Sequence, residues 1–375
     1  MRILLNGLFL IPRQVGGSET YLRSLITALA KLDNRNEYIV CLGPEAGPTF
    51  EVDNSRWRIV TSPAPSRQRP LRLALEQTWL PRVASRLNVD VIHSAGYTGP
   101  LVSRAARITS IHDMNYKRHP EDLSLLERLV YSILIPTVAR RSHRVITVSQ
   151  AARADILRWI GLPESKVSVI YLGHRDSWPG DPADDQARIA SSGVTEPFIL
   201  AVAGSYPHKN IQRLIQAFPL ESRRAGMSEV GLVLVGHAGR ARAAIEAAAS
   251  RLPQVSLLGW VDDTLLASLY RRAVALAFPS LYEGFGLPLV EAMALGAPVL
   301  TSRFGAMLEI ADGAAELVNP YAIDSIRAGL LRLVQDPDHR DNLRKLGLQR
   351  AAHFSWDRTA RETLDAYSAA AHEIQ

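Results

Sequence analysis

The residues best suited to chemistry surround a glycine-rich turn in the stretch PSLYEGFGLPLVEAMALGAPVLTS, residues 279–302. Glu283 stands before this turn, and Glu291 stands eight positions later in a predicted helix that Pro288 opens and Gly296 ends. Free amides at a helix start hold anionic or hydroxyl oxygens, and a carboxylate accepts hydrogen bonds from the vicinal hydroxyls of a sugar. The stretch therefore predicts a site for a sugar and a phosphate. For Glu291 the alternative is an acid that only complements the helix dipole.

The helix start that follows Glu283 is predicted to offer the backbone amides of Gly284, Phe285, Gly286 and Leu287, with Leu287 as the N-cap. A second anion site is predicted by VAGSYPHKNIQRLIQAF, where apolar residues recur at helical spacing from Ile211. Lys209 stands in the loop before that helix. Its charge and the helix amides would therefore address the same phosphate.

Two further features are weaker when taken alone. Gly16 and Gly17 precede a predicted helix, where backbone amides can approach an anion, although most such pairs form an ordinary tight turn. His112 ends a predicted strand, and a lone histidine at such a position is more often structural than catalytic. Both assignments therefore depend on the other motifs.

Short apolar runs alternate with longer segments of helical period, which is typical of parallel sheets covered by helices on both faces. The expected strands are 2–6, 38–42, 58–60, 89–93, 107–112, 144–148, 198–203, 232–235, 255–258, 274–277 and 298–301. The clearest helices are expected at 18–32, 71–87 and 123–141. Because such sheets bind ligands at the carboxyl ends of their strands, two of them in tandem would face each other across one cleft.

A change in composition divides the chain. Between Gly173 and Glu196 the apolar periodicity gives way to Asp, Pro, Gly and Ser, which predicts a linker. We therefore expect an α/β protein with two Rossmann-like domains, at residues 1–178 and 179–354. A last amphipathic helix, within residues 355–375, is expected to pack back toward the first domain.

Several classes of protein lose support. Neither half contains G-x-G-x-x-G followed by an acidic residue, nor G-x-x-x-x-G-K-[ST], so dinucleotide oxidoreductases and P-loop NTPases are disfavoured. The single cysteine, Cys41, cannot form an internal disulfide, and no window approaches a spanning helix. We expect a cytoplasmic protein. We expect no nucleic-acid partner, since no nucleic-acid motif accompanies the basic residues.

Charge is distributed unevenly along the chain. The first 180 residues hold 24 Lys and Arg against 15 Asp and Glu, a net charge of +9, and the remainder hold 19 against 22, a net charge of −3. The helix expected at 71–87 mixes basic and apolar residues, among them Arg72, Arg82 and Trp79, which is typical of a segment lying on an anionic membrane. The alternative is that its apolar residues face the domain core.

The Glu283 to Glu291 stretch resembles the signature of the family 4 retaining glycosyltransferases of the GT-B fold. The resemblance extends over nearly the whole chain, through PRQVGGSETYLRSLITAL, VDVIHSAGYTGPL, ITSIHDMNYKRHPED, VAGSYPHKNIQRLIQAF and VSLLGWVDDTLLASLYRRA. It implies an acceptor-binding first domain and a second domain that binds a nucleotide-sugar. The sequences of these motifs look most like those of bacterial mannosyltransferases of surface polysaccharide assembly, which favours GDP-mannose as the donor. UDP-hexoses remain an alternative.

The resemblance also implies roles for individual residues. In the family, the equivalents of Glu283 and His112 hold the donor sugar, that of Lys209 the leaving diphosphate and that of Glu291 the ribose. The implied donor contacts are Gly16, Gly17, Ser205, His208, Lys209, Val261, Glu283, Gly284, Phe285, Gly286, Leu287 and Glu291. The usual family pattern has Arg where this chain has His208, which would make the second cation weaker and dependent on pH.

We expect no metal ion, because Asp262 and Asp263 precede a predicted helix, where adjacent acids are usually caps. The resemblance implies transfer of a hexose, with retention, to a glycan or lipid-linked acceptor. The basic first half of the chain predicts peripheral contact with the inner face of an anionic membrane. Two alternatives stay open. One is a nucleotide-sugar epimerase of the same fold, and the other is a non-catalytic subunit that binds donor or lipid.

Overall fold

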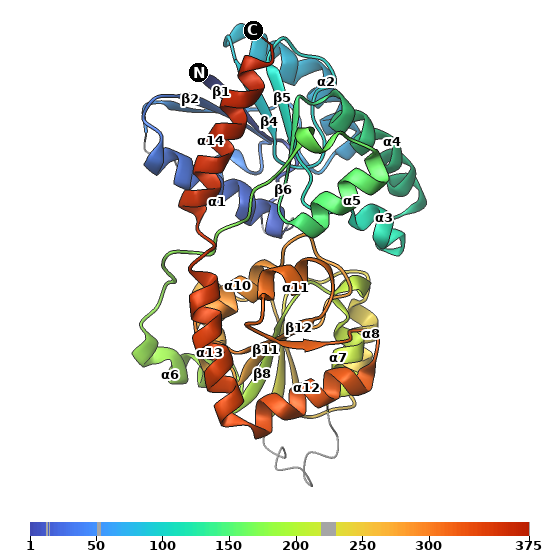
Figure 1. The fold of residues 1–375 in the computed structure, drawn as a ribbon, viewed down its shortest axis with the longest axis vertical. Coiled ribbons are helices and arrows are strands. Elements are labelled where there is room, and N and C mark those ends of the chain that lie inside the picture. The colour runs from blue at the N-terminus through green and yellow to red at the C-terminus, as the bar shows by residue number, and fades with distance from the viewer. Residues whose placement is uncertain (13, 15, 51–53, 219–229, 375) are drawn as a thin grey trace. The chain divides into compact units, whose positions relative to one another are not determined.

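We describe a computed structural model of the chain, covering residues 1–12, 14, 16–50, 54–218 and 230–374. The chain forms two units (Figure 1). The first contains Met1–Lys117, Leu123–Gly173 and Trp356–Gln375, and the second contains Arg118–Asp122 and His174–Ser355. The units thus divide after Gly173 and Ser355, where the sequence predicted divisions after residues 178 and 354.

The first unit is built on a seven-stranded parallel sheet of order β3-β2-β1-β4-β5-β6-β7. Its strands are β1 (Arg2–Gly7), β2 (Glu37–Leu42), β3 (Trp57–Thr61), β4 (Val91–Ser94), β5 (Ala106–Ser110), β6 (Arg144–Thr147) and β7 (Val167–Val169). Its helices are α1 (Gly17–Leu32), α2 (Arg69–Arg86), α3 (Asn115–Arg118), α4 (Leu125–Arg141), α5 (Gln150–Ile160) and α14 (Trp356–His372).

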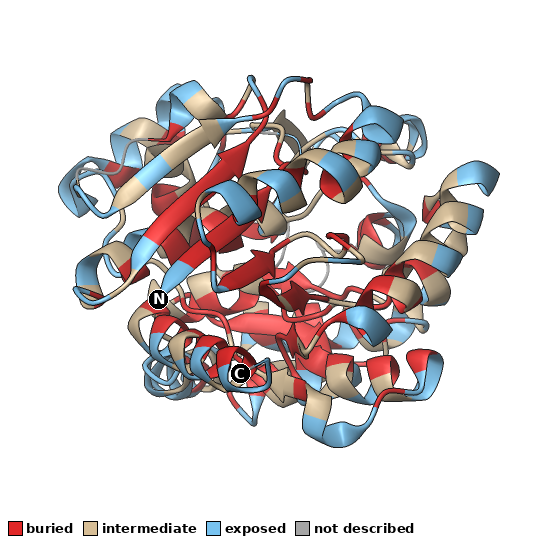
Figure 2. Cartoon of the chain, turned by 90° about the horizontal axis from the view of Figure 1, so that it is seen from above, coloured by how far each residue is buried: buried red, intermediate tan, exposed pale blue. Residues whose placement is uncertain are grey.

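Helices cover both faces of this sheet. Alternate residues of each strand point to opposite faces, so both sets are buried. Leu4 and Ile92 pack in one apolar cluster with Leu80 and Ala84 of α2. On another side, α14 contacts β4, β5 and α1, so the last helix of the chain belongs to the first unit (Figure 1). The strands are coloured as buried along most of their length in Figure 2.

The second unit has a six-stranded parallel sheet of order β10-β9-β8-β11-β12-β13. Its strands are β8 (Phe198–Val202), β9 (Gly231–Val235), β10 (Val255–Gly259), β11 (Ala275–Phe278), β12 (Val299–Ser302) and β13 (Glu316–Val318). Its helices are α6 (Asp185–Ser191), α7 (Ile211–Ala217), α8 (Arg242–Ala249), α9 (Asp263–Arg272), α10 (Leu287–Ala294), α11 (Gly305–Ala311), α12 (Ile323–Gln335) and α13 (Pro337–Ala351).

The predicted linker was wrong in one respect, because it contains a helix. Helix α6 lies within it and packs against α9. Asp185 of α6 is buried and accepts hydrogen bonds from the guanidinium of Arg271 and the hydroxyl of Ser268. The apolar residue Ile189 is also buried. Because α6 has few apolar residues, its packing depends on the polar contacts of Asp185, which could not be predicted from the sequence of the helix alone.

The membrane interpretation of the helix at 71–87 was also wrong. In α2, Leu75, Trp79 and Val83 pack against the apolar cluster that contains Leu80, and Arg72 is 9% exposed. The apolar face of α2 is therefore part of the core. No helix within the described ranges is long and apolar enough to cross a membrane.

Candidate active site

The second sheet has a point at which strand order reverses, and the predicted anion-binding loops lie there. From β8 the chain builds outward through β9 and β10, and then returns to place β11 on the other side of β8. In open parallel sheets, ligands bind at the carboxyl ends of the strands that flank such a reversal. Lys209 follows β8 and Glu283 follows β11, so the topology brings these two residues to one edge.

Lys209 and Glu283 form a close ion pair. The ammonium nitrogen of Lys209 lies 2.7 and 2.8 Å from the two carboxylate oxygens of Glu283. The side chains are 19% and 12% exposed, so the pair is largely sheltered from water. The ammonium also lies 5.7 Å from the ring centre of Phe278, whose face favours a cation. The sequence predicted both residues at the site but did not predict their pairing.

Backbone contacts fix the two loops to each other. The Leu281 N–H donates to the carbonyl of His208 at 2.7 Å. The buried amide of Asn210 donates to the carbonyls of Pro279 and Pro320, at 3.0 and 2.7 Å. Asn210 has a φ of 63°, in the left-handed region that asparagine tolerates better than most residues. Asn210 therefore clamps the Lys209 loop onto the Glu283 loop.

Helix α10 has a different N-cap from the predicted one. Its N-cap is Gly286, not Leu287, and no side chain of the described residues caps it. Gly286 has a φ of 101°, which favours glycine, and a Cβ there would lie 2.6 Å from the Cε of Met307. No described side chain caps this first turn, in which Pro288 has no N–H and the Leu289 N–H donates to the Gly286 carbonyl at 3.0 Å, so oxygen atoms of a ligand would meet the backbone that precedes Pro288.

Glu291 lies on the side of α10 that meets α9. The hydroxyl of Tyr270, which is fully buried, donates to one Glu291 carboxylate oxygen at 3.1 Å. Burial raises the pKa of Glu291, while the positive charge of Arg175 opposes the shift. Arg175 itself pairs with Asp263 at 2.7 Å. Tyr270 thus orients the carboxylate through one of its oxygens, Oε2.

The remaining predicted residues of this unit have defined surroundings. The Ser205 N–H donates to the carbonyl of His237, and the Ser205 side chain is buried. His208, the expected second cation, has Nδ1 2.6 Å from a carboxylate oxygen of Asp122. Val261 lies between β10 and α9, where Asp262 is the N-cap and accepts from the Leu265 N–H. Asp262 is therefore a helix cap, as the position before the helix predicted.

In the first unit, His112 lies two residues beyond β5 with a fixed ring. Its Nε2 is 3.0 Å from the Ala95 carbonyl and donates to it, which leaves Nδ1 without a hydrogen. Nδ1 is buried and has no partner among the described residues. Rings of Tyr21 and Tyr97 contact the imidazole edge to face, at centroid distances of 4.7 and 5.6 Å. Burial lowers the pKa of His112, although the charge of Asp113 opposes this, so the ring is a neutral acceptor.

Gly16 and Gly17 open helix α1. Gly16 is the N-cap, with a φ of 57°, and a Cβ added there would meet no atom of the described residues within 4 Å. Both glycines are exposed. The motif also includes Arg13 and Val15, which lie outside the described residues. The glycines therefore leave the start of α1 open to solvent.

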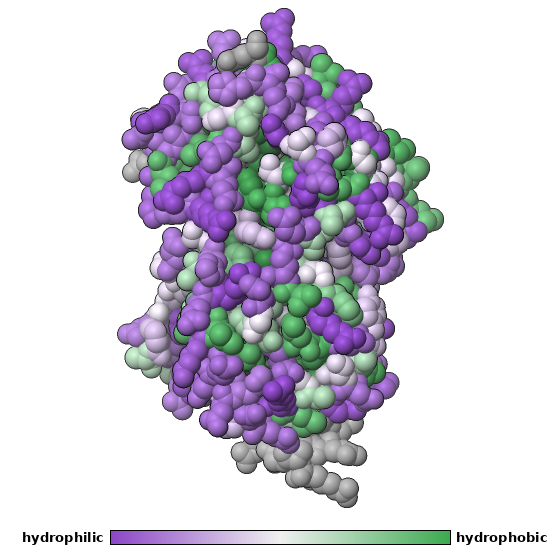
Figure 3. Space-filling view, in the orientation of Figure 1, coloured by the Kyte–Doolittle hydropathy of each residue, from purple (hydrophilic) through white to green (hydrophobic). Residues whose placement is uncertain are grey.

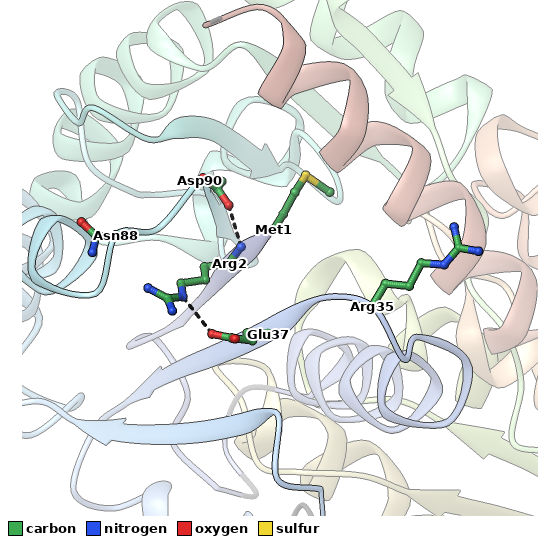
Figure 4. A pocket seen from close by; sticks show the side chains of 6 residues that line it. All are labelled: Met1, Arg2, Arg35, Glu37, Asn88 and Asp90. Atoms are coloured by element: carbon green, nitrogen blue, oxygen red, sulfur yellow. Dashed lines mark hydrogen bonds and ion pairs between the residues drawn. The ribbon is translucent and has the colours of Figure 1, made fainter.

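A separate hollow of about 330 Å³ lies at the amino ends of β1 and β2 and is lined by Met1, Arg2, Arg35, Glu37, Asn88 and Asp90 (Figure 4). Three of the charged residues that line it are bonded to one another. Arg2 pairs with Glu37 at 2.8 Å, and the Arg2 N–H donates to Asp90 at 2.7 Å. Since ligands of parallel sheets bind at the opposite edge, we assign this hollow no chemistry.

Two family descriptions match the chain. "Glycosyl transferases group 1" matches residues 184–350, and "Glycosyltransferase Family 4" matches residues 15–177. An O-antigen chain mannosyltransferase B from Escherichia coli is 30% identical over 292 residues, which cover 72% of this chain and 73% of that protein. The chain therefore belongs to the glycosyltransferase family that these two descriptions, group 1 and family 4, define for its two halves.

Other similarities agree with the family. An O-antigen chain mannosyltransferase from Salmonella typhimurium is 29% identical over 280 residues, covering 73% of each chain. Sucrose-phosphate synthase from Thermosynechococcus elongatus superposes with a TM-score of 0.79 and 21% identity, covering 98% of each chain. The predicted GT-B fold of two Rossmann-like units is confirmed for this glycosyltransferase.

Sequence reasoning missed several residues that shape the site of the glycosyltransferase. Tyr270 holds Glu291, Asn210 clamps two loops, and Tyr21 contacts His112. Asn210 directly follows Lys209 in the predicted anion-binding loop, and this position was the signal from which its role could have been predicted. The partners of Glu291 and His112 come from distant parts of the chain, and only the fold could reveal them.

Proposed function

We propose that this glycosyltransferase moves a mannosyl residue from GDP-mannose to a glycan or lipid-linked acceptor, with retention of configuration and without a metal ion. The observation that carries the proposal is the Lys209–Glu283 pair beside the uncapped start of α10, at the reversal of the second sheet. The names of the mannosyltransferase relatives support the choice of sugar. Such a reaction would serve surface polysaccharide or glycolipid synthesis.

The donor contacts follow from the chemistry of each group. Lys209 would bind the diphosphate together with backbone amides that precede Pro288, and Glu283 would accept hydroxyl hydrogens of the hexose. Glu291 would accept from the ribose, through the oxygen that Tyr270 leaves available. His112, neutral and with an Nδ1 lone pair that no described residue uses, would accept from a hydroxyl of the same hexose.

Gly16, Gly17, Ser205, His208 and Val261 would complete the donor contacts. The two glycines would offer backbone amides to the diphosphate, and Val261 would meet the base through its main chain. Ser205 and His208 lie in the loop that carries Lys209. Because the Ser205 N–H is bonded to His237, its contribution would come from the hydroxyl.

The chemical step would break the bond from the anomeric carbon to the diphosphate oxygen and form a bond to the acceptor oxygen on the same face. The acceptor proton would pass to an oxygen of the departing diphosphate. Negative charge grows on that diphosphate as the bond breaks, and the Lys209 ammonium and nearby backbone amides stabilise it most in the transition state. In this scheme Lys209 supplies the charge that a divalent ion supplies in other transferases.

A screen of nucleotide-sugars tests the donor. Thermal shifts are measured with GDP-mannose, UDP-glucose and ADP-glucose, because a ligand at a hundred times its dissociation constant adds about 2.7 kcal/mol of stability. Lys209→Gln is the control that should lose the shift. Stabilisation by GDP-mannose alone supports the proposal, and stabilisation only by another nucleotide-sugar contradicts the proposed donor. Proton spectra of the glycoside product report retention.

Donor turnover without acceptor separates the alternatives. Conversion of the donor into an isomeric nucleotide-sugar would identify an epimerase, and binding without any turnover would identify a non-catalytic subunit. Transfer that requires an added glycan or lipid-linked acceptor supports the proposed function.

We also propose peripheral contact with the inner face of an anionic membrane, through α4 and not α2. Four large apolar side chains on adjacent turns of α4 are exposed: Leu125 at 80%, Leu126 at 71%, Leu129 at 60% and Ile133 at 63%. Apolar surface lies along this helix at the edge of the first unit in Figure 3. The excess of cations in the first 180 residues complements anionic lipid.

Vesicle co-sedimentation tests this contact. Leu126→Ser with Leu129→Ser should release the protein from phosphatidylglycerol vesicles, while charge reversal at Arg82 and Arg86 of α2 should change binding much less. Binding that the α4 variant leaves intact would contradict the assignment, as would dimerisation of the wild type that the same variant abolishes.

A further inference from the structure

His112 contacts a buried chain of polar side chains that has no part in the roles proposed above. Tyr21 of α1, which is 2% exposed, lies edge to face against the His112 ring, with a centroid distance of 4.7 Å and an interplanar angle of 73°. The Tyr21 hydroxyl is 3.0 Å from the hydroxyl of Ser110 at the end of β5. The ring that limits the motion of His112 is therefore itself held by a hydrogen bond.

The chain continues to the C-terminal helix. Ser110 Oγ lies 2.8 Å from Nε2 of His93 on β4, and Nδ1 of His93 lies 2.7 Å from the Tyr367 hydroxyl on α14. His93, Ser110 and Tyr367 are 0% exposed. Residues 93 and 367 are 274 positions apart, so the contact joins the first part of the chain to its last helix.

The two hydrogen bonds of His93 must run in the same direction along the chain. Burial, with a smaller effect from His112, lowers the pKa of His93 to about 3, so its ring is neutral. A neutral imidazole donates through one nitrogen and accepts through the other. One of its hydroxyl partners, on Tyr367 or Ser110, therefore donates to it while the other accepts. Loss of the Tyr367 hydroxyl leaves Nδ1 of His93 buried and unpaired. It also removes the constraint on the direction of the hydrogen bond between His93 and Ser110.

We propose that Tyr21 is a positioning residue for His112, and that the chain Tyr367–His93–Ser110–Tyr21 holds it from the C-terminal helix. The ring of Tyr21 and the Ala95 carbonyl together keep Nδ1 of His112 aimed as an acceptor. The effect on the reaction rests on the proposed role of His112 in holding the hexose. The effect on the ring itself does not.

The first experiment compares two ligands. His112 is proposed to touch the sugar but not the nucleotide, so the ratio of GDP-mannose affinity to GDP affinity reports its position. His112→Ala should lower this ratio about tenfold, and Tyr21→Phe and Tyr367→Phe should lower it about threefold, the range of one neutral hydrogen bond. Tyr38→Phe is the matched control, because Tyr38 is also buried and bonded, but to Asp33, and should leave the ratio unchanged.

The second experiment needs no ligand. In long-range ¹H–¹⁵N spectra, His112 should show the Nε2–H tautomer in the wild type and in Tyr38→Phe, and exchange broadening or mixed tautomers in Tyr21→Phe. An unchanged His112 signal in Tyr21→Phe and Tyr367→Phe overturns the inference. If the signal changes but His112→Ala leaves the affinity ratio unaltered, the proposed role of His112 fails while the positioning stands. Should a Tyr367 variant not fold, Tyr21→Phe alone decides, since it removes one hydroxyl and keeps the ring.

Discussion

Glu76→Gln should change how the stability of the first unit depends on pH. Glu76 is 1% exposed on α2, and one of its oxygens accepts a hydrogen bond from the Thr98 hydroxyl at 3.1 Å. The Arg72 guanidinium lies 3.9 Å away. Burial raises the pKa of Glu76 to about 7, and the charge of Arg72 and the bond from Thr98 only partly oppose this. Near neutral pH the folded protein therefore holds a proton that an exposed carboxyl would release.

The sign follows from proton counting. The unfolded carboxyl releases its proton near 4.5 and the folded one near 7, so between these values the folded state binds more protons. The stability that the protonated form contributes is complete below pH 4.5 and is lost as pH rises through about 7. A pKa raised from 4.5 to about 7 corresponds to about 3 kcal/mol, of which about 2 kcal/mol is lost between about pH 5 and 7.

Glutamine copies the protonated carboxyl and cannot ionise. The stability of Glu76→Gln relative to wild type should therefore rise by about 2 kcal/mol from about pH 5 to 7 and level off above about pH 8. Urea unfolding measured across this range reports the difference between the two proteins, so other titrating groups cancel. In Arg72→Met the Glu76 carboxyl loses its cation, and the loss of stability should extend to higher pH.

Glu45→Gln is the control of opposite sign. Burial would raise the pKa of Glu45, but hydrogen bonds from the Ser66 and Arg67 amides lower it. Its contribution is therefore present above the ordinary pKa and lost as pH falls through the lowered one, so the wild type should be favoured over Glu45→Gln at neutral pH. A difference between wild type and Glu76→Gln that stays constant from pH 5 to 8 would refute the reasoning.

Three further predictions concern the donor site. Glu291→Ala should weaken nucleotide-sugar binding by about 1.5 to 3 kcal/mol while Glu291→Gln retains part of it, and equal calorimetric affinities of Ala variant and wild type would remove Glu291 from the ribose site. Lys209→Gln and Glu283→Gln should each weaken donor binding, and the double variant should lose about 1 to 2 kcal/mol less binding free energy than the sum of the two single losses, because each single change leaves a sheltered charge without its partner. Losses that add strictly would contradict this. EDTA should leave sugar transfer intact, and loss of transfer that Mg²⁺ or Mn²⁺ restores would show that the reaction needs a metal.

The fold could be predicted from the sequence where signals were local and repeated. Apolar runs followed by helical periods placed most of the strands, because burial on both faces makes a parallel strand apolar throughout. Two strands escaped, β7 and β13, each of three residues, which is too short for any period to register. Helix α6 escaped because Asp185 supplies much of its attachment, and an acidic residue reads as part of a linker.

The site could be predicted only as a set of positions. The motifs gave Lys209, Glu283 and His112, which follow strand ends, and Glu291, which lies in the helix that follows the glycine turn. Their partners were out of reach, because Tyr270 and Tyr21 lie in ordinary helical patterns. The orientation of α2 was equally hidden. A helix with apolar and basic residues at the same spacing can face a core or a membrane, and only the sheet that α2 packs on distinguishes them.

The pairing of Lys209 with Glu283 bears on how the proposed donor site can stay folded without its ligand. A single sheltered charge is costly, and a close ion pair lowers that cost by satisfying each group with the other. A diphosphate would offer the ammonium a second anion, and the hexose hydroxyls would offer the carboxylate hydrogens to accept. Donor binding would then exchange the ion pair for contacts with the donor, so that neither protein charge is left without a partner. Asn210 and the Leu281 amide keep the two loops in place during that exchange, so the ammonium and carboxylate need only reorient their side chains.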